Sequence, residues 1–205
     1  MKVFIDVGAY NGDTLKLAGQ YDYEQIHCFE PSIQHHQAII RTIVENSWRN
    51  RVQLHKFGLG NRYERQRLYG AGTDGASIYK AKRHTSSTIE DIEIFPAGDW
   101  FQAAIREDDE VHLKINVEGA EIPIMNDLIN NRQLWKVREL CLFYDCMKVP
   151  GHEPMMPMME RKLSRYPHLF NRLCINKRVV EYGDPKLGEN RTFVVNWLKS
   201  INSKK

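Results

Sequence analysis

Residues 4–14 read FIDVGAYNGDT, and they combine a strand, a turn and the start of a helix. An apolar run typical of a buried strand ends here, a turn containing Gly8 and Gly12 follows, and a helix is expected from Asp13. Glycines let the backbone approach a ligand closely, and free N–H groups at a helix start favour polar or anionic ligand groups. In an open α/β sheet, ligands bind outside the carboxyl ends of the strands. We therefore expect a cofactor at this turn.

The glycine spacing of this turn separates two classes of cofactor. A dinucleotide fingerprint reads G-x-G-x-x-G after the strand. This chain instead has D-x-G-x-x-x-G, from Asp6 to Gly12. A turn with this glycine spacing is poorly suited to bind a pyrophosphate. It suits the zwitterionic methionine part of S-adenosylmethionine, with Asp6 near the cationic end.

A second segment, FEP at residues 29–31, follows the next predicted strand. Glu30 ends this strand, 22 residues after Gly8, and an acidic side chain there can accept both hydrogen bonds of a ribose diol. Pro31 ends the strand, and Ser32 is a suitable N-cap for a helix to about residue 46. The first two segments together predict a nucleoside site.

A third segment, LKINVEGAE at residues 113–121, again runs from a buried strand into a helix through a glycine turn. It places Asn116, Glu118 and Glu121 at the same sheet edge as the first two segments. We interpret Glu121 as complementing the helix dipole. Glu118 precedes the turn, and we expect it to have a functional role.

Apolar runs alternate with helix-like segments along the whole chain. Strands are predicted at residues 3–7, 25–29, 52–57, 111–117, 138–144, 173–175 and 192–197, and helices at residues 13–19, 32–46, 120–131 and 154–166. This alternation predicts a mainly parallel sheet with helices on both faces, and the last two strands, joined without a helix, suggest an antiparallel edge strand. Residues 61–99 are interpreted as an inserted hairpin or loop region. In the second helix, we expect the histidines at 35–36 at the surface and four isoleucines on the inner side: Ile33, Ile39, Ile40 and Ile43.

Length and composition set further expectations. The 205 residues fit one domain over residues 1–205, with residues 202–205 as a frayed tail. A net charge of +3 is too small to indicate nucleic-acid binding. The four cysteines show no metal-ligand spacing, so we expect buried, reduced thiols and no metal site. We find no signal peptide and no membrane span, and we expect a cytoplasmic protein.

Together, the three segments resemble the FkbM family of S-adenosylmethionine-dependent methyltransferases. That family shows an F-x-D-V-G-A-x-x-G-x-x-T/S turn, then F-E-P, then L-K-I-D-V-E-G-A-E. Residues 4–14, 29–31 and 113–121 follow this order, and the resemblance covers roughly residues 3–145. It implies an α/β class I methyltransferase (Rossmann-like) fold, a three-layer sandwich around a seven-stranded sheet with six parallel strands and one antiparallel edge strand. It also implies methylation of a hydroxyl or carboxylate oxygen, often on a sugar, polyketide or other natural product.

The resemblance also implies a set of cofactor-binding residues. Glu30, followed by Pro31, would hold the ribose, and residues 57–61, including Gly58, would lie against the adenine edge. The methionine side would be bound by the first turn, and Asn116 in the third segment is also expected to bind the cofactor. The residues of the first turn are Asp6, Gly8, Ala9, Tyr10, Asn11, Gly12 and Thr14. Where the family has an aspartate, this chain has Asn116, which argues against a general-base or metal role there because an amide is neither a base nor a good metal ligand.

A hydroxyl acceptor must lose a proton when it is methylated, so a base near the reacting oxygen is expected. The candidates are Glu118, Asp145 and His152. Asp145 follows a predicted strand, and its alternative interpretation is a strand-terminating aspartate. His152 lies in a loop that could overhang the site, and its alternative interpretation is an ordinary surface histidine. The expected acceptor is a small molecule or a glycan.

Other functions stay open at this point. A nicotinamide-dependent oxidoreductase is disfavoured by the missing middle glycine. A non-catalytic binding or scaffold protein with a methyltransferase fold is kept open by Asn116. A nucleic-acid methyltransferase would need a concentrated basic face or an N-P-P-Y-like motif, and neither is visible. Homo-oligomer formation also stays open.

Overall fold

The computed structural model describes residues 1–82, 86–169, 171–175 and 190–203. The central elements are short strands and helices that alternate along the chain, as the apolar periodicity predicts. In chain order the elements are β1 (Lys2–Val7), α1 (Asp13–Ala18), β2 (Gln25–Phe29), α2 (Ile33–Glu45), β3 (Val52–His55), β4 (Gly58–Gly60), β5 (Glu64–Tyr69), β6 (Ile89–Pro96), α3 (Ala97–Ala104), β7 (Glu110–Ile115), α4 (Glu121–Asn130), η1 (Leu134–Lys136), β8 (Val137–Phe143), η2 (Asp145–Lys148), α5 (Met155–Leu163), β9 (Asn171–Ile175) and α7 (Asn190–Asn202).

The main sheet has the strand order β3-β2-β1-β7-β8-β9, and all of its neighbouring strands are parallel. The chain builds outward from β1 to β3, then returns with β7 on the other side of β1. This reversal makes the carboxyl ends of β1 and β7 the switch point, where open α/β sheets bind ligands. The predicted α/β class and mainly parallel sheet are confirmed.

One predicted strand is wrong. Residues 192–197, expected as an antiparallel strand, belong to helix α7. The residues that α7 buries are Val194, Trp197, Leu198 and Ile201, and their spacing is that of a helix face rather than the two-residue repeat of a strand. In the described part of the chain, the main sheet therefore has six strands, all parallel, instead of the expected seven with an antiparallel edge strand.

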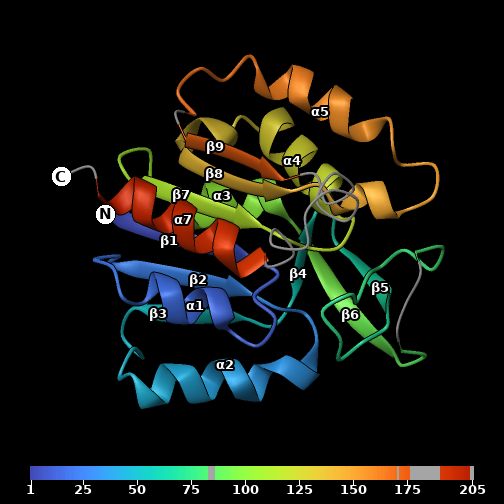
Figure 1. Ribbon diagram of the computed structural model, residues 1–205, viewed down its shortest axis with the longest axis horizontal. Coiled ribbons are helices and arrows are strands. Elements are labelled where there is room, and N and C mark those ends of the chain that lie inside the picture. The colour runs from blue at the N-terminus through green and yellow to red at the C-terminus, as the bar shows by residue number, and fades with distance from the viewer. Residues whose placement is uncertain (83–85, 170, 176–189, 204–205) are drawn as a thin grey trace.

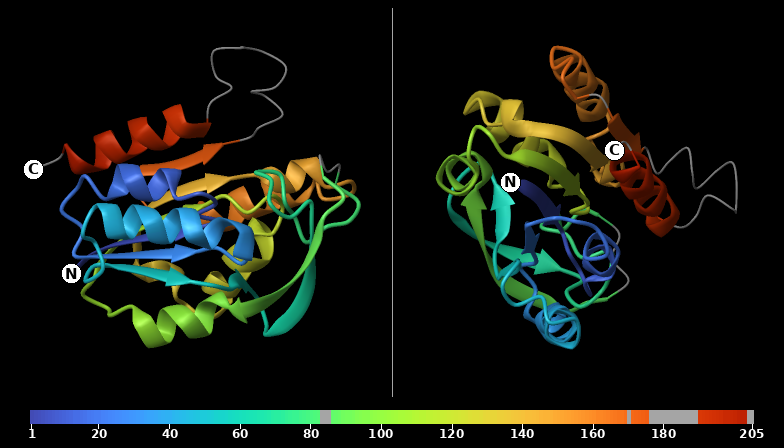
Figure 2. Two further views of the ribbon diagram at one scale, coloured as in Figure 1. Left: turned by 90° about the horizontal axis from the view of Figure 1, so that it is seen from below. Right: turned by 90° about the vertical axis from the view of Figure 1, so that its left-hand side faces the viewer.

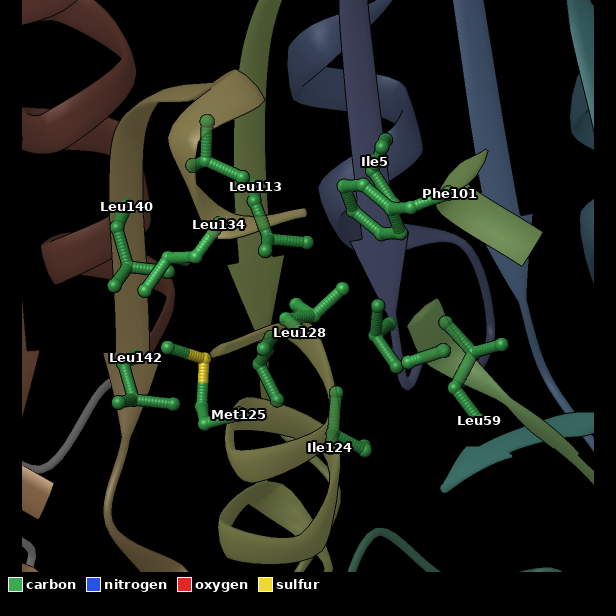
Figure 3. Packing of buried hydrophobic residues seen from close by; sticks show 14 of the residues in the cluster. Ile5, Leu59, Phe101, Leu113, Ile124, Met125, Leu128, Leu134, Leu140 and Leu142 are labelled. Atoms are coloured by element: carbon green, nitrogen blue, oxygen red, sulfur yellow. The ribbon is translucent and has the colours of Figure 1, made fainter. Parts of the chain in front are cut away.

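Helices cover both faces of the main sheet. Helices α3, α4 and α5 share one hydrophobic cluster with the sheet, and α1, α2 and α7 share another on the opposite face. Figure 2 shows α1 and α7 on one side of the strands and α3 on the other. In Figure 3, Leu113 of β7 and Leu140 of β8 lie opposite Met125 and Leu128 of α4. The result is a three-layer arrangement.

A second sheet, with the order β4-β6-β5, lies beyond the carboxyl ends of the main strands (Figure 1). Strands β5 and β6 form an antiparallel hairpin, as expected for the inserted region, and β4 pairs with β6 in parallel. The hairpin contributes Leu68, Ile92 and Ile94 to a separate small hydrophobic cluster. This cluster faces back toward the main sheet and forms one side of the pocket described below.

The described C-terminal helix packs against the first strand. Asn202, the last residue of α7, accepts a hydrogen bond from the Lys2 ammonium at 2.7 Å, although the sequence analysis placed it in the frayed tail. Residues 204 and 205 of that predicted tail lie outside the described residues. Among the described residues, no helix has the length and apolar character needed to cross a bilayer.

Candidate functional site

A pocket of about 670 Å³, including space open to solvent, lies at the carboxyl edge of the sheet. Its floor comes from all three sequence segments, and its lining there includes Gly8, Tyr10, Glu30, Pro31, Asn116 and Glu118. The opposite wall comes from the second sheet and the loop inside its hairpin. Its apolar residues are Leu68, Ala76, Ile78, Ile92 and Ile94, and the loop adds two polar residues, Thr73 and Asp74. The inserted region therefore completes the pocket rather than forming a separate unit.

Gly8 makes the close approach between β1 and β7 possible. Its φ is +81°, and an added Cβ would lie 2.0 Å from the carbonyl oxygen of Asn116. The N–H groups of Gly8 and Ala9 both donate to the carbonyl oxygen of Phe29, each at 3.0 Å, and the N–H of Tyr10 donates to Glu30 Oε2 at 2.8 Å. Three successive amides of the first turn thus join it to the end of β2.

Glu30 is a buried carboxylate held by the backbone. Oε2 accepts the N–H of Tyr10, and Oε1 accepts the N–H of Ser32 at 2.9 Å. Its own carbonyl oxygen accepts a hydrogen bond from His36 Nε2 at 2.8 Å. Burial raises the pKa of Glu30 to about 7, while the N–H bonds from Ser32 and Tyr10 oppose the rise. Since each carboxylate oxygen can accept more than one hydrogen bond, both oxygens keep capacity for a ligand.

Helix α2 turns its two histidines inward. Ile33 is 69% exposed, whereas His35 and His36 are only 5% and 7% exposed, so the predicted surface position of the pair is wrong. His35 lines the pocket, and its ring centroid lies 4.4 Å from that of Tyr10. Its Nδ1 lies 2.8 Å from Asn11 Oδ1, while its buried Nε2 has no hydrogen-bond partner among the described residues. Sequence reasoning missed this residue because periodicity alone did not show which face of the helix meets the first turn.

Asn116 follows β7 and contributes a second buried acceptor. Its N–H donates to the carbonyl oxygen of Val7 at 3.0 Å, which fixes it beside the end of β1. Its Oδ1 is buried and, in the part of the chain that the structure describes, has no hydrogen-bond partner. A buried polar atom without a partner costs free energy, and at a pocket wall it indicates a place for a ligand donor.

Glu118 lines the pocket between two lysines. Its Oε2 lies 2.8 Å from Lys82 Nζ and 3.1 Å from Lys148 Nζ. The backbone of Glu118 has φ +55°, and its carbonyl oxygen accepts a hydrogen bond from Ser77 Oγ at 2.7 Å. Non-glycine residues held at positive φ are uncommon and cluster at functional sites.

Asp145 and His152 are near this network but do not line the pocket. Asp145 is fully buried, with Oδ1 3.2 Å from Lys148 Nζ, the same ammonium that contacts Glu118. The His152 ring packs edge-on against Tyr79, with 4.7 Å between centroids. A base role for either residue therefore requires that the acceptor reach past the observed pocket wall.

The remaining predicted residues divide into two groups. Pro31 and Gly58 line the pocket as expected. Asp6 is fully buried behind it, 2.8 Å from Lys114 Nζ, and burial raises the pKa of Asp6 while the Lys114 charge opposes the rise. The other residues of the first turn that do not line the pocket are Ala9, Asn11, Gly12 and Thr14. Asn11 still acts on the pocket through its hydrogen bond to His35.

Glu121 joins two loops beside the site. It is fully buried in the first turn of α4, where its Oε2 accepts the N–H of Gly119 at 2.9 Å and its Oε1 accepts the N–H of Cys146. Burial and, next, the Asp145 charge raise its pKa to about 7. The residue thus does more than complement the helix dipole. Among the described residues, no three His, Cys, Asp or Glu side chains gather in a way that could hold a metal ion.

Comparison with known proteins supports the fold. No family model and no curated protein matches the chain. A solved structure titled "Methyltransferase FkbM from Methylobacillus flagellatus KT" matches with a TM-score of 0.50 and 18% sequence identity. The match covers 81% of this chain and 38% of the other, so this chain spans well under half the length of that protein. At this identity the match shows a shared methyltransferase-type fold, and it agrees with the FkbM resemblance of the three segments.

Proposed function

We propose that this chain binds S-adenosylmethionine and transfers its methyl group to an oxygen of a small-molecule or glycan acceptor. The observation that carries the proposal is the nature of the polar groups around the pocket. Glu30, His35 and Asn116 present hydrogen-bond acceptors, and the lining residues that the structure describes include no lysine or arginine. S-adenosylmethionine is a cation that offers donors from its ammonium, its ribose hydroxyls and its adenine amino group. An acceptor-rich pocket suits such a ligand.

The same set of polar groups around the pocket disfavours a nicotinamide dinucleotide as the ligand. A pyrophosphate needs N–H donors or cationic side chains around its oxygens. The N–H groups of Gly8, Ala9 and Tyr10 are already bonded to Phe29 and Glu30. Binding a pyrophosphate at this turn would break those bonds and bring anionic oxygens close to a buried carboxylate.

In the proposed binding mode, Glu30 accepts hydrogen bonds from the ribose, and Asn116, next to Gly8, faces the methionine part. The apolar wall around Leu68 and Ile94 covers the flat base and excludes water from the pocket. Methyl transfer is an in-line displacement, for which the bound cofactor supplies the electrophilic carbon. The protein contributes mainly by aligning the acceptor oxygen and keeping water out.

Among the three candidate bases, Glu118 has the best position because it lines the pocket. Its carboxylate would take the proton that the acceptor hydroxyl loses as the new bond forms. Lys82 and Lys148 hold this carboxylate from two sides, which fixes its orientation. Asp145 forms an ion pair with the Lys148 ammonium, so it acts on Glu118 through that ammonium.

Calorimetry on the full chain tests the cofactor. We expect S-adenosylmethionine and S-adenosylhomocysteine to bind and NAD not to bind. Glu30→Ala should weaken S-adenosylhomocysteine binding at least tenfold, whereas Glu45→Ala, an exposed glutamate on α2, should leave it unchanged. NAD binding without S-adenosylmethionine binding would overturn the proposal.

A second experiment tests catalysis. Labelled S-adenosylmethionine is incubated with the protein and a panel of glycans and hydroxylated metabolites, and methylated products are identified by mass spectrometry. We expect label on an oxygen of at least one acceptor. Cofactor binding with no transfer to any member of the panel would instead favour a non-catalytic binding protein.

A further inference from the structure

The first turn of α2 brings a second acceptor to the pocket beside Glu30. We propose that His35 Nε2 accepts a hydrogen bond from one ribose hydroxyl of the bound nucleoside while Glu30 accepts from the other. This assignment rests on the proposed function and adds a residue that determines specificity for an intact ribose. None of the three sequence segments assigns a role to His35.

The surroundings of His35 define which of its nitrogens can accept. Nδ1 lies 2.8 Å from Asn11 Oδ1, and because an amide oxygen only accepts, the proton belongs on Nδ1. Nε2 is then left with a lone pair and no proton. It is buried, it has no partner within the described ranges, and its residue lines the pocket. A ligand donor is the group that this atom lacks.

Burial favours the neutral form of the His35 ring. Burial lowers the pKa of His35, and the positive charge of His36 would lower it further, while Glu90 on β6 acts in the opposite direction. A neutral ring is required because a protonated Nε2 would donate rather than accept.

The same loop positions both acceptors. The N–H of Tyr10 donates to Glu30 Oε2, and the ring of Tyr10 packs against His35 at 4.4 Å between centroids. The next residue, Asn11, holds His35 Nδ1. The segment after β1 therefore contacts both the carboxylate and the imidazole that line the pocket. Two acceptors held by one segment suit a vicinal diol, whose two hydroxyls can each donate one hydrogen bond.

The test is calorimetry with S-adenosylhomocysteine and with its 2′-deoxy and 3′-deoxy analogues. The variant is His35→Phe, which keeps a flat ring to pack on Tyr10 but removes the acceptor, and the control is Gln37→Ala at an exposed position of the same helix. We expect His35→Phe to bind S-adenosylhomocysteine about tenfold more weakly, about 1.4 kcal/mol, and Gln37→Ala to bind as the wild type does. For one of the two deoxy analogues, the difference between wild type and His35→Phe should disappear.

Two results would overturn the role of His35. One is unchanged binding in His35→Phe. The other is an equal loss with all three ligands, which would show that the ring acts by packing alone. Both results leave the proposed function intact, because that function is tested by cofactor binding to the wild type and by methyl transfer to the acceptor panel, neither of which depends on the His35 variant.

A measurement on the wild type covers the case in which His35→Phe does not fold. The ¹⁵N resonance of His35 Nε2 reports directly on whether its lone pair accepts a hydrogen bond. We expect this resonance to move toward the hydrogen-bonded range when S-adenosylhomocysteine is added, and to move less with the deoxy analogue that lacks the contacting hydroxyl. An Nε2 resonance unaffected by saturating ligand would refute the proposal.

Discussion

The ammonium Nζ of Lys114 lies 2.8 Å from Oδ1 of Asp6, in the middle of the sheet where β1 and β7 pair side by side. Both side chains are almost completely buried. The same Nζ donates to the carbonyl oxygen of Gly8 at 2.8 Å. The charge of Asp6 is thus balanced from the neighbouring strand, and Lys114 holds the first turn of the site against β7.

Replacing Lys114 tests how much the buried ion pair with Asp6 contributes to the free energy of unfolding. Lys114→Met leaves the Asp6 carboxylate buried without its cation, so we expect the free energy of unfolding to fall by about 3–5 kcal/mol. Urea denaturation measures the change. The double variant Asp6→Asn with Lys114→Met should recover part of the loss, because it removes the uncompensated charge. Lys16→Met, which breaks an exposed pair with Asp13, should change stability by less than about 1 kcal/mol.

Alanine substitutions at Gly8 and Gly151 distinguish the cost of a left-handed backbone from the cost of steric crowding. Their φ angles are +81° and +82°, but an added Cβ at Gly8 would collide with the carbonyl oxygen of Asn116, while nothing lies within 4 Å of a Cβ at Gly151. We expect Gly151→Ala to cost about 1–2 kcal/mol of stability from the left-handed backbone alone. Gly8→Ala should cost at least about 2 kcal/mol more, because β1 and β7 must move apart. Similar losses in urea denaturation of the two variants would contradict this account.

Ligand binding should depend on pH through Glu30. Burial raises the pKa of Glu30 to about 7, and the ionised carboxylate is the better acceptor for hydroxyl donors. As pH falls below about 7, Glu30 takes up a proton that must be lost on binding, so the affinity for S-adenosylhomocysteine should fall by up to roughly tenfold per pH unit. Calorimetry at pH 6, 7 and 8 measures this slope. In Glu30→Gln the affinity should be lower at pH 8 and nearly independent of pH, and a slope equal to that of the wild type would assign the titration to another group.

The three candidate bases can be ranked by their kinetics. With an acceptor from the labelled-cofactor panel, Glu118→Gln should lower kcat by about 10²–10⁴, because it removes a base at the pocket wall and keeps the side-chain shape. His152→Gln should lower kcat less than tenfold, since His152 packs on Tyr79 outside the pocket lining. Steady-state kinetics at saturating cofactor gives both values. A larger loss in His152→Gln than in Glu118→Gln would move the base to the loop.

Local sequence patterns are sufficient to predict the bounds of several helices and strands. Strands β1, β2 and β7 and helices α1 and α4 lie within one or two residues of their predicted bounds, because each begins or ends at a glycine turn or a proline that acts locally. The window at residues 192–197 was too short to distinguish two periodicities, and only the full length of α7 shows the helical spacing of Val194, Trp197 and Ile201.

By itself, the sequence determined that three strand–turn–helix units bring Gly8, Glu30 and Asn116 to one edge of a parallel sheet, because the polypeptide must turn at the end of each buried strand. Only the tertiary structure decided where the side chains near that edge point. Because β7 pairs with β1, Asp6 contacts Lys114 and lies behind the pocket. Because α2 packs against the first turn, His35 lines the pocket. These outcomes depend on contacts between segments far apart in the chain, and spacing along the sequence carries no information about such contacts.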